Sequence, residues 1–521
     1  MKLNIQDTFN KELPSDPIIE NSRRQVSNAC FSYVKPKKTK EPKLLHSSAE
    51  VQNLLGLTKD DAASDEFLQV FTGNNVYKGT EPYAMCYGGH QFGNWAGQLG
   101  DGRAINLGEV EHNNNSWALQ LKGAGPTPYS RTADGLAVLR SSIREYLCSE
   151  AMFHLGVPTT RALSLSLSGD DVLRDILYNV NSAYEKGAIV TRVAPSFLRF
   201  GNYEIFAARE EIATLKTLID YTINHFYKHL GKPSKQVYLD FFKEVADKTL
   251  DMIIHWQRVG FVHGVMNTDN MSILGLTIDY GPYGWLEGYD YNWTPNTTDR
   301  QNKRYRYGNQ ANMGLWNLLK LANAIYPLIE ETAPLESVLE SYKTDFEKKY
   351  HKMMCSKIGL ENNFDTDGQL INELENTLHL TETDMTIFFR NLATISINDR
   401  SEAAYKKISD AFYDISKAKE NTKTKWLAWI ESYLNRLDKE TQNDFERKKQ
   451  MNLVNPKYVL RNYMAQLAID AADNSDYSLI DEFYQLLKKP YDEQPEFNKW
   501  FAKRPEWARN KVGCSMLSCS S

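Results

Sequence analysis

The chain has 521 residues, of which 42% are hydrophobic and 24% charged, and its formal net charge is −5. This composition is typical of a globular protein with a full core, and the mild negative charge excludes the basic surface that nucleic-acid binding normally shows. The longest apolar runs, such as 274–278, are far shorter than the roughly 20 residues that cross a bilayer, so no membrane span is predicted.

Residues 1–60 are predicted to form an N-terminal extension. The stretch 35–43 is basic and interrupted by Pro36 and Pro42, so we expect a solvated linker there. The N-terminus carries acidic residues and lacks an apolar segment, which fits neither a secretory signal nor a clear transit peptide. We therefore expect a monomer in the cytoplasm, or in mitochondria if the chain is eukaryotic.

Residues 61–200 combine many glycines with short β-like runs, a composition typical of a nucleotide-binding lobe. Strands are expected at 104–107 and 117–121. The apolar spacing over 136–155 predicts a helix, which Asp134 and Gly135 precede and the sequence Gly-Val-Pro at 156–158 ends.

Two further features of this lobe suit a bound nucleotide. Lys122 ends the second strand and Glu145 lies 145 − 122 = 23 residues later in the helix; kinases orient phosphates with such a pair, although each residue alone is typical of a surface. Gly100, Gly102 and Arg103 form a glycine-rich turn, for which a phosphate cradle and a structural turn both remain open.

Residues 201–425 are predicted to form a helical lobe, with a long amphipathic helix over 238–259 that leads into a metal-binding loop. In the loop, 263–281, the pair Asp269 and Asn270 is followed by Asp279 across a short apolar hairpin. Such oxygen ligands suit one Mg²⁺ together with phosphate oxygens. The loop resembles that of protein kinases, but Val265 stands where their catalytic Asp would be, which leaves Asp269 as the proton acceptor.

Other charged and thiol-bearing residues carry weaker signals. Arg192 and Arg199 flank a strand-like segment between the lobes and suit phosphate oxygens, although each alone is more often a surface or structural arginine. We expect His90 and His263 to make structural hydrogen bonds, since neither has a zinc-ligand partner at the usual spacing. Four scattered cysteines are expected to be buried in the core: Cys30, Cys86, Cys148 and Cys355.

Residues 426–521 are predicted to be a helical extension with a cysteine-containing tail. From about residue 330 onward, charged and apolar residues alternate in helical fashion, at 335–350 within the helical lobe and at 422–437 at the start of the extension. The tail ends with Cys514 and Cys519 as candidate redox residues, and a frayed end with incidental cysteines is the alternative.

Taken together, these motifs resemble the selenoprotein O family of pseudokinase-fold protein adenylyltransferases. The resemblance covers about 30–310 and is carried by long motifs in one order: Tyr-Gly-Gly-His-Gln-Phe-Gly at 87–93, Leu-Gly-Asp-Gly-Arg-Ala at 99–104, Gly-Pro-Thr-Pro-Tyr-Ser-Arg at 125–131, 138–145, 158–161 and the metal loop. It implies an α+β, protein-kinase-like two-lobed fold. It also implies transfer of AMP from ATP, or of UMP from UTP, to Ser, Thr or Tyr hydroxyls of proteins, with pyrophosphate as leaving group.

The same resemblance assigns roles to individual residues. Lys122 and Glu145 would form the ion pair, Asn270 and Asp279 would hold Mg²⁺ or Mn²⁺, and Asp269 would accept the proton. The positions that match nucleotide-binding residues of the family are Gly100, Gly102, Arg103, Lys122, Asp134, Gly135, Arg192, Arg199 and Asp279.

The chain also shows where the resemblance stops. Leu136 stands where an arginine is expected in many relatives, which would lower nucleotide affinity. Cys519 occupies the position of the selenocysteine of eukaryotic members, so this is a cysteine-containing member whose tail is expected to form a disulfide with Cys514 or with a redox protein. Two other functions stay open: kinase-type phosphate transfer by the same residues, and a non-catalytic nucleotide-binding scaffold.

Overall fold

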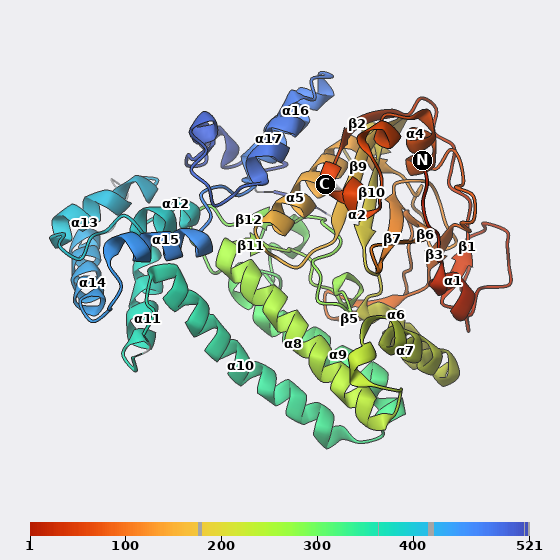
Figure 1. Cartoon of the computed structure of the whole chain (residues 1–521), viewed down its shortest axis with the longest axis horizontal. Helices are drawn as coiled ribbons and strands as arrows, with labels where there is room; N and C mark the ends of the chain where they lie inside the picture. Colours follow the sequence, from red (N-terminus) through yellow and green to blue (C-terminus); the bar gives the residue numbers. More distant parts are fainter. Residues whose placement is uncertain (176–179, 363, 415–420, 515, 519–521) are drawn as a thin grey trace.

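The computed structural model describes residues 1–521 except 176–179, 363, 415–420, 515 and 519–521. The chain forms a sheet-containing N-terminal part and a helical C-terminal part (Figure 1). This mixture of sheet and helices is the one that the sequence predicted. The likeness to a protein kinase, and the domain limits at 60, 200 and 425, stay predictions.

The N-terminal part is built on an antiparallel sheet whose strands follow the order β1-β3-β6-β7-β10-β9-β2, with β8 paired to β10. The predicted strands at 104–107 and 117–121 are confirmed as parts of β6 and β7. The bounds are β1 Phe31–Tyr33, β2 Lys43–Ser47, β3 Tyr83–Met85, β6 Ala104–His112, β7 Asn115–Lys122, β8 Ala137–Val138, β9 Arg161–Arg174 and β10 Ala183–Ala194.

Helix α5, Leu139–His154, confirms the helix predicted at 136–155. Its apolar residues except Phe153 are buried because the helix lies against β9 and β10. The helix ends before Gly156, whose φ of +71° suits a residue without Cβ. Smaller elements surround the sheet: α1 Thr8–Glu12, α2 Ala49–Leu54, α3 Lys59–Ala62, α4 Asp65–Phe71, and a separate hairpin of β4 Gly88–Gln91 and β5 Asn94–Gln98.

Three long helices, α8, α9 and α10, run together through the helical part (Figure 1). Helix α8, Lys235–Val259, contains the helix predicted at 238–259. The Ser234 side chain caps its first turn by accepting from Val237 N, and Gly260 closes it in the left-handed region. The neighbouring elements are α6 Phe200–Ala208, α7 Ile212–Phe226, β11 Phe261–Val262, β12 Gly284–Trp285, α9 Gln310–Ile329 and α10 Thr332–Ile358.

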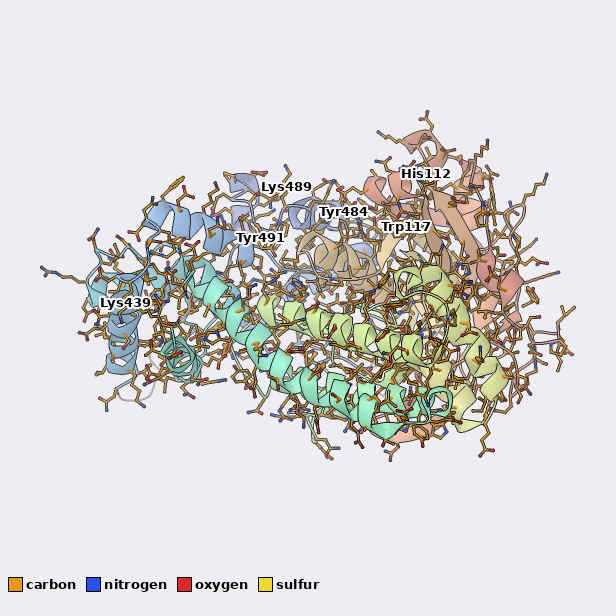
Figure 2. The ribbon with its side chains drawn as sticks, turned by 60° about the horizontal axis from the view of Figure 1, so that its bottom comes forward. His112, Trp117, Lys439, Tyr484, Lys489 and Tyr491 are labelled. Atoms are coloured by element: carbon orange, nitrogen blue, oxygen red, sulfur yellow. The ribbon has the colours of Figure 1, made fainter. Side chains whose placement is uncertain are left out.

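The C-terminal helices have two locations. In Figure 1 the group α11 to α15 lies at the end farthest from the sheet, and α16 and α17 return toward α5. Tyr484 and Tyr491, labelled in Figure 2, bond this C-terminal segment to the N-terminal part of the chain. Their hydroxyls donate to Ser48 Oγ and to Leu155 O, both at 2.8 Å. The bounds are α11 Asp367–Leu378, α12 Met385–Leu392, α13 Ser401–Ile408, α14 Thr422–Leu437, α15 Asp444–Val454, α16 Asn462–Asp473 and α17 Ser478–Leu487.

Two further sequence predictions concern the N-terminal linker and membrane spans. Of the linker predicted at 35–43, residues 35–42 contain no helix or strand and are mostly exposed, whereas Lys43 begins β2. Among the described residues, no helix combines the length and the hydropathy needed to cross a bilayer.

Candidate active site

One cavity, of about 730 Å³, brings together most of the predicted nucleotide and metal residues. Its wall combines the glycine-rich turn after β5, the end of β7, the approach to α5, and the metal loop. The predicted residues that line it are Gly100, Gly102, Arg103, Lys122, Asp134, Gly135, Arg192, Asp269, Asn270 and Asp279. A larger cavity of about 930 Å³, between 287–303 and the segment 504–516, is lined by none of them. The smaller cavity is therefore the candidate active site.

The two arms of the metal loop pair with other segments of the chain, and not with each other as in the predicted hairpin. Ser272 makes an isolated bridge to Arg199, and Thr277 makes one to Thr159. Asp269 and Asn270 lie in a short 3₁₀ turn, Thr268–Asn270. Asp279 has φ of +56°, a region that costs a non-glycine residue energy and that is common at functional sites.

The predicted lysine–glutamate pair is present and belongs to a buried row of alternating charges. Lys122 Nζ lies 2.5 Å from Glu145 Oε2, and Glu145 Oε1 lies 3.2 Å from Arg192 Nη1. Arg192 Nη1 also donates to Asp279 Oδ1 at 2.9 Å, and Arg199 Nη1 donates to Asp279 Oδ2. Both arginines are 2% exposed. Each of these buried positive charges lies beside a carboxylate that balances it.

These neighbours set the ionisation of the group. Burial alone would raise the pKa of Asp279, but the charges of Arg199, Arg192 and Lys122 outweigh it and hold that pKa far below the ordinary value. Burial lowers the pKa of Lys122, and the charge of Glu145 opposes this shift. Asp279 is therefore a firmly ionised carboxylate.

Asp269 has the opposite environment. It is 8% exposed, and burial raises its pKa to about 7 despite the hydrogen bond that Gln91 donates to it. Oδ2 accepts from Gln91 Nε2 at 3.1 Å, whereas Oδ1 is buried without a hydrogen-bond partner. Two nearby carboxylates thus differ in basicity, a pattern that separates a proton acceptor from a permanently charged ligand.

Asn270 and Asp279 are the oxygen donors that a hard cation prefers. Asn270 Nδ2 donates to Val265 O at 2.9 Å, which turns the amide so that its oxygen is the end free to meet a cation. Asp279 presents both oxygens to arginines, so a cation there must share or replace one of these ion pairs. The donor set fits Mg²⁺ or Mn²⁺.

The glycine-rich turn is required by packing as well as by the cavity. Gly100 has φ of +70°, and a Cβ there would lie 2.3 Å from the ring of Tyr129. Gly135 has φ of +75°, and a Cβ there would lie 2.3 Å from the backbone of Gly125. The structural explanation is therefore confirmed for Gly100, and the turn borders the cavity, while its role as a phosphate cradle stays a prediction.

Two predicted residues take places behind the cavity wall. Glu145 supports Lys122 as predicted. Arg199, assigned to the nucleotide by resemblance, does not appear in the lining; its Nη1 donates to the carbonyl of Asp269 at 2.8 Å as well as to Asp279. Its position joins the two acidic residues of the loop.

Among the lining residues of this cavity that the sequence did not single out, Arg174 and Gln91 contact predicted acidic residues. Arg174, at the end of β9, lines it and is held by Asp134 through contacts of 2.8 and 2.9 Å. Gln91, in β4, lines it and contacts Asp269. Gln91 lies within the motif 87–93, which could have indicated it, whereas no local pattern marks Arg174 because its partner lies 40 residues earlier.

The histidines and isolated cysteines have the structural roles predicted. His263 is 1% exposed and its Nε2 lies 2.9 Å from Ile278 O, and His90 Nδ1 lies 2.6 Å from Glu204. The four scattered cysteines are free and buried: Cys30, Cys86, Cys148 and Cys355.

The tail is packed where the structure describes it. Cys514 is 1% exposed and free, and burial raises its pKa to about 11, which disfavours a reactive thiolate. Leu517 N donates to Pro295 O at 3.0 Å, and Thr297 N donates to Leu517 O at 2.7 Å. Residues 512–514 and 516–518 are therefore packed and not frayed. Cys519 lies outside the described residues.

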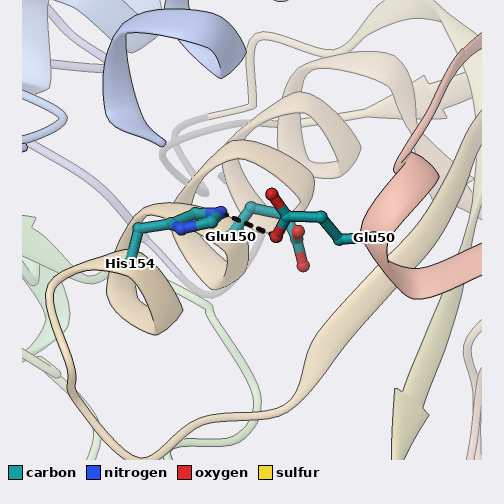
Figure 3. Close-up of side chains that lie close together, drawn as sticks. All are labelled: Glu50, Glu150 and His154. Atoms are coloured by element: carbon teal, nitrogen blue, oxygen red, sulfur yellow. Dashed lines mark ion pairs between the residues drawn. The ribbon is translucent and has the colours of Figure 1, made fainter. Parts of the chain in front are cut away.

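A separate acidic group lies away from this cavity. Glu50, Glu150 and His154 have ligand atoms within 4.8 Å of one another, and Figure 3 shows the ion pair between His154 and Glu50 at 3.2 Å. Arg161 already binds both oxygens of Glu150 at 2.7 Å, and Lys488 lies 3.1 Å from Glu50. Since fixed cations balance these carboxylates, the group joins α2, α5 and α17 rather than forming the predicted metal site.

A mixed α/β fold whose cavity unites basic residues, a glycine turn and acidic oxygen donors suits a nucleotide-handling transferase, and comparison with known proteins gives the class. The protein nucleotidyltransferase YdiU of Flavobacterium johnsoniae is 64% identical over 519 residues, covering 100% of this chain and 99% of its own. Proteins of the same name from Rhodopirellula baltica and Aromatoleum aromaticum are 54% and 52% identical, covering at least 99% of both chains. The chain is an enzyme of the nucleotidyltransferase class.

The family follows from a second comparison. The family model described as protein adenylyltransferase SelO matches residues 18–489. The chain belongs to this family, which confirms the resemblance found in its motifs, and ATP is the nucleotidyl donor that the family's activity implies.

Proposed function

We propose that this enzyme transfers AMP from ATP to the hydroxyl groups of Ser, Thr or Tyr side chains in other proteins, and that UTP serves as a second donor. The observation that carries the proposal is the single cavity in which Lys122, Arg192, Asp269, Asn270 and Asp279 meet. We further propose that the sheet-containing part and the helical part, which both contribute residues to this cavity, are the two lobes of a kinase-like fold.

The reaction assigns one task to each group. The acceptor oxygen attacks the α-phosphorus of ATP, the bond from that phosphorus to the bridging oxygen breaks, and pyrophosphate leaves. Asp269 takes the hydroxyl proton, for which its buried, raised-pKa carboxyl is suited. Lys122 and Arg192 hold the leaving phosphates, since fixed positive charge lowers the energy of charge that develops on them.

The metal site in this proposal consists of Asn270 and Asp279. A bound Mg²⁺ or Mn²⁺ would offset charge on the triphosphate. The chain's own residues position the rest: Glu145 holds the ammonium of Lys122 in the cavity, and Arg199 ties Asp279 to the backbone of Asp269.

Intact-mass spectrometry of the enzyme and a candidate acceptor protein, incubated with ATP and Mg²⁺, tests the proposal. We expect a mass gain of AMP with release of pyrophosphate, which Asp269→Asn slows about 10²- to 10⁴-fold, the usual contribution of a general base, and which Lys122→Ala also slows strongly. Asp247→Asn, in an exposed helix pair with Lys243, is the matched control and keeps full activity. A mass gain of phosphate alone would favour the kinase alternative.

A further inference from the structure

The hairpin formed by β4 and β5 covers the side of the loop that carries the proposed proton acceptor. His90 N donates to Thr268 Oγ1 at 2.7 Å, and Phe92 N donates to Asn267 Oδ1 at 3.1 Å. The donors of both bonds are backbone N–H groups, so the hairpin remains docked on the loop whatever side chain stands at 91.

Under the hairpin, the two carboxylate oxygens of Asp269 differ in their hydrogen-bond partners. A Cβ on Gly89 would lie 3.0 Å from Oδ1, so the hairpin packs closely over that oxygen and a side chain at 89 would force a shift of a few tenths of an ångström. Oδ1 is buried and has no hydrogen-bond partner among the described residues. Oδ2 is therefore the oxygen left to meet a substrate at the cavity, which Asp269 and Gln91 both line.

Gln91 reaches this remaining oxygen. Its Nε2 donates to Oδ2 of Asp269 at 3.1 Å, and a carboxylate oxygen has a second lone pair for another donor. An acceptor hydroxyl that passes its proton to Oδ2 must approach next to the Gln91 amide.

We propose that Gln91 is a positioning residue for the acceptor hydroxyl: its amide fixes Oδ2 of Asp269 in the orientation that receives the proton, and borders the place where the hydroxyl lies. This inference rests on the proposed role of Asp269. The residues proposed to hold the phosphates are Lys122 and Arg192, and the side chain of Gln91 instead contacts Asp269, so we expect its removal to slow transfer and to leave ATP binding unchanged.

The test compares Gln91→Leu, which keeps the size but cannot donate, with Gln91→Glu, which is isosteric but cannot donate when ionised. The readout is AMP incorporated by the enzyme with ATP and Mg²⁺, including incorporation into itself. We expect kcat to fall about 10- to 100-fold in both variants, the usual effect of losing a hydrogen bond to a charged group, while KM for ATP stays within twofold. Asn94→Ala, across the hairpin turn from Gln91, is the matched control and keeps wild-type kcat.

A double-variant cycle separates a role through Asp269 from a structural role. If Gln91 acts through Asp269, adding Gln91→Leu to Asp269→Asn causes no further loss, because the carboxylate it orients is already gone. Multiplied losses, an unchanged kcat in both single variants, or a rise in KM for ATP matching the fall in kcat would each overturn the inference. Full activity in Asp269→Asn would instead overturn the proposed function.

Discussion

Replacing Asp279 by asparagine removes the negative charge that lies between two buried arginines. Arg192 and Arg199 are each 2% exposed and both donate to this carboxylate. Arg192 keeps Glu145 at 3.2 Å in the variant, whereas the next carboxylate to Arg199 is Asp101 at 3.9 Å. The variant therefore leaves Arg199 with the weaker compensation.

The size of the effect follows from the burial of the two arginines, because Asp279 itself is 21% exposed at the cavity. Removing one partner of a buried ion pair costs about 3–5 kcal/mol, because the other charge is left uncompensated. With an unfolding entropy of about 2.1 cal/mol/K per residue, cooperative unfolding of 521 residues gives about 1.1 kcal/mol/K. The expected fall in Tm is therefore about 3–5 °C.

Thermal unfolding followed by circular dichroism, with a chelator present, measures this fall. Inorganic pyrophosphate then serves as an anion that can replace the lost charge, and we expect it to raise the Tm of Asp279→Asn more than that of the wild type. Asp247→Asn provides the control, because its partner Lys243 is 50% exposed and exposed pairs contribute about 0–1 kcal/mol.

The outcome that refutes this reasoning is specific. If Asp279→Asn unfolds within 1 °C of the wild type, and pyrophosphate shifts both proteins equally, then Asp279 does not neutralise the two arginines. The cavity would then need another source of negative charge near Arg192 and Arg199.

Three further predictions concern other parts of the chain. Burial raises the pKa of Asp7 to about 6 from 3.8, so the charged carboxylate destabilises the fold above pH 6 and not below pH 4. Asparagine tolerates the φ of +50° at this position. The free energy of unfolding of Asp7→Asn should therefore exceed that of the wild type by about 1–2 kcal/mol at pH 8, after allowance for solvent screening. Urea unfolding at both pH values checks this, and an equal gain at pH 3.5 contradicts it. Leu136→Arg adds a guanidinium to the cavity and should lower the Kd for ATP about 3- to 10-fold by calorimetry; an unchanged Kd contradicts it. Arg174→Ala should raise the KM for ATP about 3- to 10-fold, and Asp134→Ala should raise it less because the guanidinium remains; a larger effect at Asp134 would show that Arg174 is not the contact.

Several features of the site could be predicted because neighbours in sequence specify them. The metal loop places Asp269, Asn270 and Asp279 within eleven residues, and the turn predicted between them brings them to one cavity. Lys122 and Glu145 follow from a strand and a helix whose periodicity is local, and the structure joins them at 2.5 Å. The helices 136–155 and 238–259 were recognised for the same reason.

The tertiary structure alone decided how these residues are paired. Arg192 and Arg199 meet Asp279 across 87 and 80 residues, Gln91 meets Asp269 across 178, and Arg174 meets Asp134 across 40. The packing of the tail against Pro295 and Thr297, which buries Cys514, is equally long in range.

The sequence by itself determined the types of side chain available to the site and the local turns that carry them. The folded chain decided which charges neutralise each other, which oxygen of Asp269 stays reachable, and which arginine lies behind the wall. The physical reason is that local periodicity depends on backbone geometry over a few residues, whereas pairing in a low-dielectric interior depends on which distant segments are buried together.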